Sequence, residues 1–399
     1  MHAALALPEA PALLGRTGWA LFLASLIILC AVVPVLNLWV PADNMFHMSD
    51  YAVALVGKIM CYAICALAMD LIWGYTGILS LGHGLFFAIG GYVMGMYLMR
   101  QIGTDGNYKS HLPDFMVFLD WKTFPWHWTF SDSFVATLLL IVLVPGLLAW
   151  VFGYFAFRSR IKGVYFSIIT QALTFAAMLL FFRNETGLGG NNGFTDFKRI
   201  LDLPIATPAM RMTLFVLTAW VLLMCFLMAR WLVQSKFGRV LQAIRENEFR
   251  AEAIGYLVVV YRTWSSVLSA LFACLAGAML ALWLRYNGPD TSLSFEVMMD
   301  VLLIVVIGGM GSLYGAALGS ALFLVAQSYL QDVLRWASEA CSAVPWLAAL
   351  LSPDRWLLWL GLLFVLSVYY FPTGITGRLR ARAASVARAQ SQGRSSAGG

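Results

Sequence analysis

Charged residues are scarce in this sequence, and their scarcity excludes most soluble folds. Only 12% of the 399 residues are Asp, Glu, Lys or Arg, whereas 61% are hydrophobic. A soluble domain has about 25% charged residues. Several apolar runs reach the roughly 20 residues that a helix needs to cross the hydrocarbon core of a bilayer. The composition therefore predicts an all-α fold, a polytopic bundle of membrane-spanning helices.

Patterns that would build a disulfide framework, a metal site or a catalytic centre are also missing. Five of the six cysteines lie in apolar runs, where a thiol behaves as a small hydrophobe. The sequence has no CxxC pair and no Cys/His cluster. It also has no HExxH or GxSxG motif, and no close carboxylate pair within the apolar runs. We therefore expect no metal, no cofactor and no catalytic residue, and we do not expect an enzyme.

The apolar runs predict about ten spans. No small-residue cleavage pattern follows the first run, so we expect a span there and not a signal peptide. The glycines of IGGMGSLYG, residues 307–315, predict a turn between the eighth and ninth runs. The runs cover residues 18–40, 51–73, 77–99, 133–157, 161–182, 211–233, 257–284, 297–310, 314–331 and 355–371.

Basic residues orient these spans. With the N-terminus inside, the inner segments carry more Lys and Arg than the outer loops, which hold most of the acids. An even number of spans then returns the C-terminus to the cytoplasm. We expect a cytoplasmic N-terminus at 1–17, a membrane domain at 18–371 and a basic, disordered cytoplasmic tail at 372–399 that attracts anionic lipid. The net charge of +6 therefore reflects topology and gives no sign of nucleic-acid binding.

The longest inner loop, QSKFGRVLQAIRENEFRAEAIGY at 234–256, has helical periodicity. Its apolar residues recur at i, i+3, i+4 and i+7 around a polar stretch at 245–249. This predicts two short helices joined by a charged turn. A helix resting on the membrane surface is the alternative, but the mixed charges favour docking into a protein groove. The residues expected to serve such docking are Gly238, Arg239, Ala243, Arg245, Glu246, Glu248, Arg250 and Gly255.

A second unusual stretch is GYTGILSLGHG, residues 74–84, which has glycines and polar residues where a lipid-facing helix would have leucines. Interrupted backbone at membrane depth is tolerated only where it is buried in protein or lines a water-filled cavity. The glycines here are expected to serve helix packing. Packing or a simple turn is also the alternative for the polar residues. Those expected to line a solute pathway are Thr76, Ser80, His83, Thr170, Gln171, Asn191 and Asn192.

The polar loop at 234–256 resembles the coupling loop of permease subunits in bacterial ABC importers of the branched-chain amino-acid type, in their larger, M-type subunit. GYTGILSLGHG, RIKGVYFSIIT (160–170) and VVIGGMGSLYGAALG (305–319) resemble the same family, in the same order. The resemblance covers about residues 50–375. Four motifs in register are more specific than any one of them alone.

Two further stretches resemble the urea-uptake branch of that family, namely residues 113–128 and 171–197. Asp70 and Ile78 stand where amino-acid permeases often carry Asn and Gln. The resemblance therefore implies urea as the solute, with a branched-chain or other amino acid or a short amide as the alternative. Asp70 lies near the inner end of its span, where we expect it to pair with an arginine.

The resemblance also implies a division of labour in a bacterial inner membrane. This chain would form a pore with a second, different permease, two ATP-binding subunits would dock inside, and a periplasmic solute-binding protein would deliver solute. The chain has no GxxxxGK[ST] phosphate loop, so ATP would be bound by partners. An ion-coupled secondary transporter is a distant alternative. It should show an inverted repeat, and GILSLGHG and GMGSLYGA share only Gly, Ser and Leu.

Overall fold

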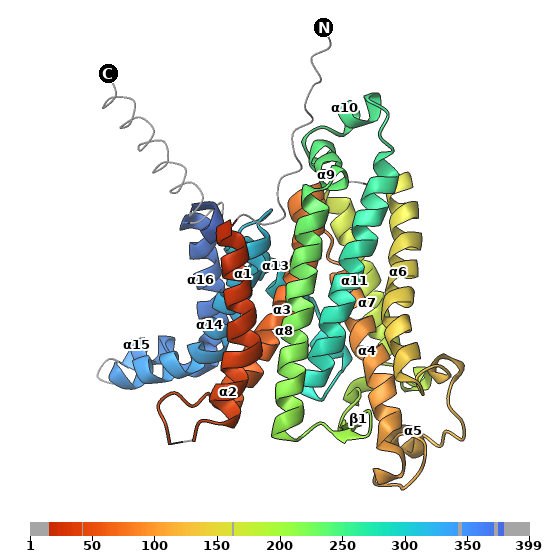
Figure 1. Cartoon of the computed structure of the whole chain (residues 1–399), viewed down its shortest axis with the longest axis vertical. Coiled ribbons are helices and arrows are strands. Elements are labelled where there is room, and N and C mark those ends of the chain that lie inside the picture. The colour runs from red at the N-terminus through yellow and green to blue at the C-terminus, as the bar shows by residue number, and fades with distance from the viewer. Residues whose placement is uncertain (1–15, 42, 162, 342–344, 371–373, 379–399) are drawn as a thin grey trace.

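The computed structural model describes residues 16–41, 43–161, 163–341, 345–370 and 374–378. They form the all-α bundle that the composition predicts, and the only strands in these ranges are the two-residue pair β1 (Arg199–Ile200) and β2 (Leu203–Pro204). Most helices run along the long axis of the bundle (Figure 1). The helices are α1 (Arg16–Ile27), α2 (Val33–Leu38), α3 (Asp50–Thr76), α4 (His83–Ile102), α5 (Asp114–Phe118), α6 (Phe134–Arg158), α7 (Val164–Phe181), α8 (Pro208–Gln234), α9 (Lys236–Glu246), α10 (Glu248–Ala253), α11 (Val258–Leu284), α12 (Pro289–Ser292), α13 (Phe295–Gly308), α14 (Leu313–Ala340), α15 (Pro345–Leu350) and α16 (Trp356–Tyr370).

Nine helical segments in the described ranges are long and apolar enough to cross a membrane, and they match nine of the ten expected runs. The tenth run, 355–371, corresponds to α16, whose 15 residues are fewer than a full crossing needs. Residue 371 lies outside the described ranges, so the tenth span stays a prediction.

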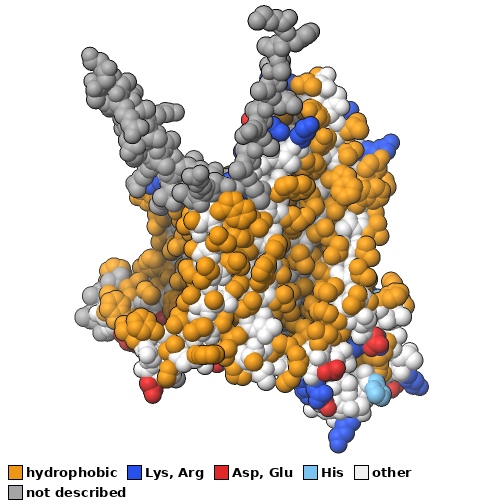
Figure 2. All heavy atoms as spheres, viewed as in Figure 1, with side chains coloured by type: hydrophobic (Ala, Val, Ile, Leu, Met, Phe, Trp, Pro, Cys, Tyr) orange, Lys and Arg blue, Asp and Glu red, His pale blue; other side chains and the backbone are white. Residues whose placement is uncertain are grey.

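The two ends of the bundle differ, and we name them by their helices. The α9 end carries α9 and α10, and the α5 end carries α5 and β1 (Figure 1). Hydrophobic side chains cover the surface between these ends, while Lys, Arg, Asp, Glu and His side chains gather near the ends (Figure 2). This band of apolar surface is what a lipid-facing bundle requires.

The core lies where α11 packs against α4 and α3. Glycines allow the α4 and α11 backbones to touch. A Cβ added at Gly277 would lie 1.8 Å from the Phe87 carbonyl oxygen, and one at Gly90 would lie 1.9 Å from the Cys274 carbonyl oxygen. Small residues at such crossings permit close helix packing in membranes. By contrast, α6 and α7 expose most of their apolar surface.

The expected termini lie almost wholly outside the described residues. One short piece of the expected disordered tail, residues 374–378, is described and is packed against the α13–α14 turn. Thr376 is buried and its hydroxyl donates to the Gly308 carbonyl at 2.7 Å. This contact holds residues 374–378 against the bundle, and the tail boundary at 372 stays a prediction.

Candidate functional site

Residues 77–82 form a non-helical segment between α3 and α4, which we call the α3–α4 break. Gly77 ends α3 in a left-handed conformation, with φ of 75°, and its N–H bonds the Trp73 carbonyl at 3.1 Å. The break starts beside Arg245 at the α9 end and finishes at His83, which touches Ser269 of α11. Ser269 lies roughly 16 Å along α11 from its start, at 1.5 Å per residue. The interruption expected from the sequence is thus inside the bundle, and the third span begins at His83 and not at residue 77.

The polar groups of the break are paired with hydroxyls of α7. Ser167 donates to the Leu79 carbonyl at 2.7 Å, and Thr170 accepts from the Leu81 N–H at 3.1 Å. Thr174 donates to the Leu81 carbonyl at 3.4 Å. These three residues lie at i, i+3 and i+7, on one face of α7. Buried backbone groups must be hydrogen-bonded, so this stripe of hydroxyls explains why the break is tolerated.

His83 joins the break to the opposite side of the bundle. Its buried imidazole lies 3.1 Å by Nδ1 from the Ser80 carbonyl and 2.6 Å by Nε2 from the Ser269 hydroxyl. The Ser269 hydroxyl also lies within hydrogen-bond reach of the Ala68 carbonyl. Since a carbonyl only accepts, the Nδ1–H tautomer satisfies Ser80, and Ser269 can then donate to Nε2 or to Ala68. His83 and Ser269 therefore connect the break, α3 and α11 through hydrogen bonds.

Three of the expected pathway residues come together around one small cavity. Ser80, His83 and Thr170 line it with residues of α6 and α11, and its volume is about 20 Å³. That is room for about one water molecule. Gln171 is the next residue on α7, half-buried, and no donor among the described residues reaches its buried Oε1. The site is assembled, but it is closed to a solute.

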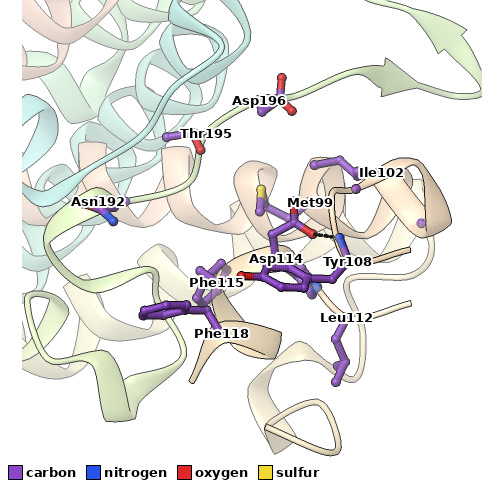
Figure 3. A pocket seen from close by; sticks show the side chains of 14 residues that line it. Met99, Ile102, Tyr108, Leu112, Asp114, Phe115, Phe118, Asn192, Thr195 and Asp196 are labelled. Atoms are coloured by element: carbon purple, nitrogen blue, oxygen red, sulfur yellow. Dashed lines mark hydrogen bonds between the residues drawn. The ribbon is translucent and has the colours of Figure 1, made fainter. Parts of the chain in front are cut away.

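The other expected pathway residues lie elsewhere. The Thr76 hydroxyl donates to the Ile72 carbonyl of its own helix at 2.7 Å. Thr76 also lines a separate pocket of about 190 Å³ beside Arg245 at the α9 end. Asn191 and Asn192 are exposed in a short turn at the α5 end, where Asn192 lines a pocket of about 350 Å³ (Figure 3). The seven residues therefore fall into three places along the bundle.

The loop at 234–256 forms the two short helices that its pattern predicts, α9 and α10. Asn247 separates them, and its side chain caps α10 by accepting the Arg250 N–H at 3.0 Å. Gly238 is buried where a Cβ would lie 2.3 Å from the Val233 carbonyl oxygen. Gly255 has φ of 99°, a conformation that favours glycine, and it returns the chain to α11. Both glycines thus have local structural roles.

Two charged residues of this loop bind other helices of the chain. The Arg245 guanidinium donates to the Gly74 carbonyl at the end of α3. Glu248 binds Arg262 of α11 through two hydrogen bonds, of 2.9 and 3.2 Å, and both side chains are largely buried. The sequence grouped Arg245 and Glu248 with the docking residues. Glu248 is largely buried against Arg262, whereas Arg245 is still exposed, so its role in docking stays a prediction. Arg239, Ala243, Glu246 and Arg250 are exposed, as docking requires.

The end of α3 also binds the α13–α14 turn. Asp70 Oδ1 accepts the Gly311 N–H at 2.7 Å, and the Tyr75 hydroxyl donates to the Gly311 carbonyl at 3.1 Å. Asp70 therefore bonds a backbone N–H here, and its expected pairing with an arginine stays a prediction. Through Gly74, Asp70 and Tyr75, the end of α3 links α9 to this turn.

Two features of this region were not predicted from the sequence. Phe249 was grouped with a polar stretch, yet its side chain is 76% exposed at the α9 end. Exposed aromatic surface outside the bilayer favours contact with another protein. Arg262, assigned only to topology, is the partner of Glu248. Within the described ranges, no three His, Cys, Asp or Glu side chains are grouped so that they could hold a metal ion.

Comparison with known proteins gives one family over most of the chain. A family model described as "Branched-chain amino acid transport system / permease component" matches residues 51–368. The high-affinity branched-chain amino acid transport system permease protein LivM of Salmonella typhimurium is 26% identical over 346 residues, covering 81% of this chain and 71% of that protein. A probable LivM permease of Methanocaldococcus jannaschii is 24% identical over 331 residues, covering 79% and 90%.

A shorter match is to the ribose import permease RbsC of Bacillus subtilis. It is 36% identical over 124 residues, which is 31% of this chain and 35% of that protein. No solved structure matches the chain.

Proposed function

Because the chain belongs to the family of branched-chain amino acid transport system permease components, we propose that it forms half of the membrane pathway of an ATP-driven importer for a small polar solute. Members of this family are transport permeases, so the chain is a multi-pass membrane subunit and not an enzyme. The other half of the pathway would come from a second, different permease. A solute-binding protein would deliver solute at the α5 end, outside the bacterial inner membrane.

The observation that carries this proposal is the contact between α9 and the end of α3. Arg245 donates to the Gly74 carbonyl, and Gly74 lies in the last turn of α3, three residues before the α3–α4 break. Two ATP-binding subunits would dock at the α9 end, in the cytoplasm with both chain termini, against exposed Glu246, Phe249 and Arg250. A movement of α9 would then act on the break through Arg245.

The break and α7 form the proposed gate. Ser80, His83, Thr170 and Gln171 would line the pathway once α7 moves away from the break, because the present cavity holds about one water molecule. Asn191 and Asn192 would lie at its outer mouth, and Thr76 at its inner one. The hydroxyls of α7 suit this role, since they can exchange backbone partners for a polar solute.

We propose urea as the solute, on the resemblance of residues 113–128 and 171–197 to urea permeases. Urea needs acceptors for its amides and a donor for its oxygen, which serine, threonine and glutamine side chains supply. A branched-chain amino acid is the second candidate, since the LivM relatives carry that name. Binding of urea, leucine and acetamide to the cognate solute-binding protein separates these candidates.

The transport proposal is tested by reconstitution in proteoliposomes with the second permease, the ATP-binding subunits and the solute-binding protein. We expect uptake to require ATP and the solute-binding protein. Charge reversal of the exposed tip, Glu246→Lys, should lower uptake about tenfold or more, since like charges meeting at an interface are strongly unfavourable. The matched control is Glu339→Lys, which changes an exposed acid in the last turn of α14.

Two outcomes would contradict the proposal. Normal uptake by the Glu246→Lys variant would show that Glu246 is not part of the docking surface. Uptake by the isolated chain, driven by an ion gradient without nucleotide, would instead favour a secondary transporter.

A further inference from the structure

The pocket of about 350 Å³ at the α5 end has no part in the pathway described above except through Asn192. It lies between the end of α4, the segment that leads to α5 and the loop at 192–196 (Figure 3). Phe115 and Phe118 of α5 lie on one side, and Thr195 and Asp196 lie across from them. The pocket is therefore formed by segments that are far apart in the sequence.

The charged residues that line this pocket are both acids, Asp114 and Asp196. The Asp114 carboxylate is held in place by the backbone N–H groups of Asn107, at 2.9 Å, and Tyr108, at 3.3 Å. Neither N–H brings a full positive charge. The pocket therefore presents carboxylate oxygens without a lining base.

Two bases that follow Asp196 in the sequence, Lys198 and Arg199, are engaged at Asp105 or only weakly at Asp196. Lys198 lies 3.5 Å from Asp196 Oδ2, in an exposed pair, and also donates to the Asp105 carbonyl at 2.7 Å. Arg199 pairs with the Asp105 carboxylate at 2.6 Å. Because exposed ion pairs are weak, a competing cation can displace Lys198 from Asp196.

Aromatic rings complete the lining. Tyr108 is 55% exposed and Phe118 is 77% exposed, and Phe115 lies between the labelled Asp114 and Phe118 positions (Figure 3). Cations bind over aromatic faces, and planar guanidinium groups also pair with carboxylates through two parallel hydrogen bonds. Aromatic rings beside two carboxylates therefore favour an organic cation over a neutral molecule.

We propose that this pocket, lined by Asp114, Asp196 and the rings of Tyr108, Phe115 and Phe118, binds a guanidinium or ammonium group. This group comes from a free small organic cation or from an Arg or Lys side chain of an extracytoplasmic protein. The site goes beyond the proposed function, whose solute is neutral, and it does not depend on the identity of that solute.

The first test measures ligand binding to the full chain in lipid nanodiscs by saturation-transfer NMR. The probe is methylguanidinium, and N-methylurea is its neutral counterpart of similar shape. We expect methylguanidinium to bind and N-methylurea to bind at least about fivefold more weakly, since loss of the charge removes charge-assisted hydrogen bonds. Equal binding of the two probes, or binding of neither, overturns the proposal.

Variants locate the binding. The double variant Asp114→Asn/Asp196→Asn should weaken methylguanidinium binding about tenfold, since it removes both carboxylate charges. Asp43→Asn, an exposed acid outside the pocket, is the matched control and should change nothing. Because Asp114 orders its own loop, the exposed Thr195→Lys serves as the second variant, placing a competing ammonium at the pocket. Unchanged binding in Thr195→Lys overturns the proposal.

A second measurement identifies the source of the cation. The affinity of the purified solute-binding protein for the reconstituted complex is compared between the wild type and Thr195→Lys. A drop of about tenfold assigns the pocket to a basic side chain of that protein, since truncating or displacing a hydrogen-bonded charge raises dissociation. Unchanged affinity together with methylguanidinium binding assigns it to a free cation. If the complex shows ATP-driven uptake but the chain does not bind methylguanidinium, only the pocket proposal is refuted. If the chain binds methylguanidinium but the complex shows no ATP-driven uptake, only the transport proposal is refuted.

Discussion

The α3–α4 break is held from two sides, by α11 and by α7, and the two helices hold it by different means. On the α11 side, His83 at the end of the break contacts Ser269. Farther along, the α4 and α11 backbones touch through Gly90 and Gly277, and 72% of the most apolar stretch of α11 is buried. On the α7 side, three hydroxyls bind the break, and only 22% of the corresponding stretch of α7 is buried. The same segment thus rests against a close-packed neighbour and a loosely packed one.

This difference indicates which neighbour can move. Separating α11 from α4 would expose close backbone contacts, whereas separating α7 would break hydrogen bonds that water or a polar solute can replace. We therefore interpret α11 as the fixed side of the break and α7 as the side that opens. Variants that weaken one side at a time can test this interpretation.

The largest effect is expected for Gly277→Ala in the α11 seam. Its Cβ would lie 1.8 Å from the Phe87 carbonyl oxygen, so α4 and α11 could not pack. We expect the free energy of unfolding to fall by about 3 kcal/mol or more, at the upper end of overpacking effects. Size-exclusion chromatography should then show little monodisperse protein. Gly361→Ala in α16, with nothing within 4 Å of its added Cβ, is the control. If both variants yield equal amounts, the seam is not close-packed.

His83→Ala removes both imidazole contacts of the break, to Ser80 and to Ser269. We expect lower thermal stability, because the Ser80 carbonyl loses its hydrogen bond, at about 1–3 kcal/mol when a buried group is left unsatisfied, while Ser269 can still donate to the Ala68 carbonyl. Uptake should also slow, while complex assembly and basal ATP hydrolysis remain. Uptake at the wild-type rate would exclude His83 from the pathway.

Thr170→Val removes one hydroxyl on the α7 side and leaves the Leu81 N–H without its acceptor. We expect the stability of the break to fall by about 1–3 kcal/mol. This loss should appear as faster backbone amide hydrogen exchange at residues 78–82. Thr170→Ser keeps the hydroxyl and should restore protection. Thr213→Val is the control, since that hydroxyl bonds only the Ala209 carbonyl in its own helix. Equal exchange in the Thr170→Val and Thr213→Val variants would contradict the role of α7.

The smallest change in stability is expected for Gln171→Ala. No described donor reaches the buried Oε1 of Gln171, so its removal should alter the unfolding free energy by less than about 0.5 kcal/mol. If α7 opens onto the pathway, uptake should nevertheless fall. A variant with wild-type stability and wild-type uptake would place Gln171 outside the pathway.

Much of the fold was predictable because lipid imposes long apolar runs and tolerates interruptions only inside protein. The α9–α10 pair followed from local periodicity, and the break followed from its glycines and polar residues. The partners were not predictable. Thr170 meets Leu81 across 89 positions, and Asp70 meets Gly311 across 241. Such pairings depend on how helices pack, which a single sequence does not encode in any local pattern.

The one-water cavity beside the break bears on how the membrane keeps its voltage. Moving one elementary charge across a membrane potential of 100 mV releases about 2.3 kcal/mol. A continuous file of water through the protein would therefore let protons cross the membrane down this potential. The cavity between α4, α6, α7 and α11 has room for about one water molecule, so it is too small for such a file. If the pathway runs through the break, this closed form would keep protons from crossing the bilayer there.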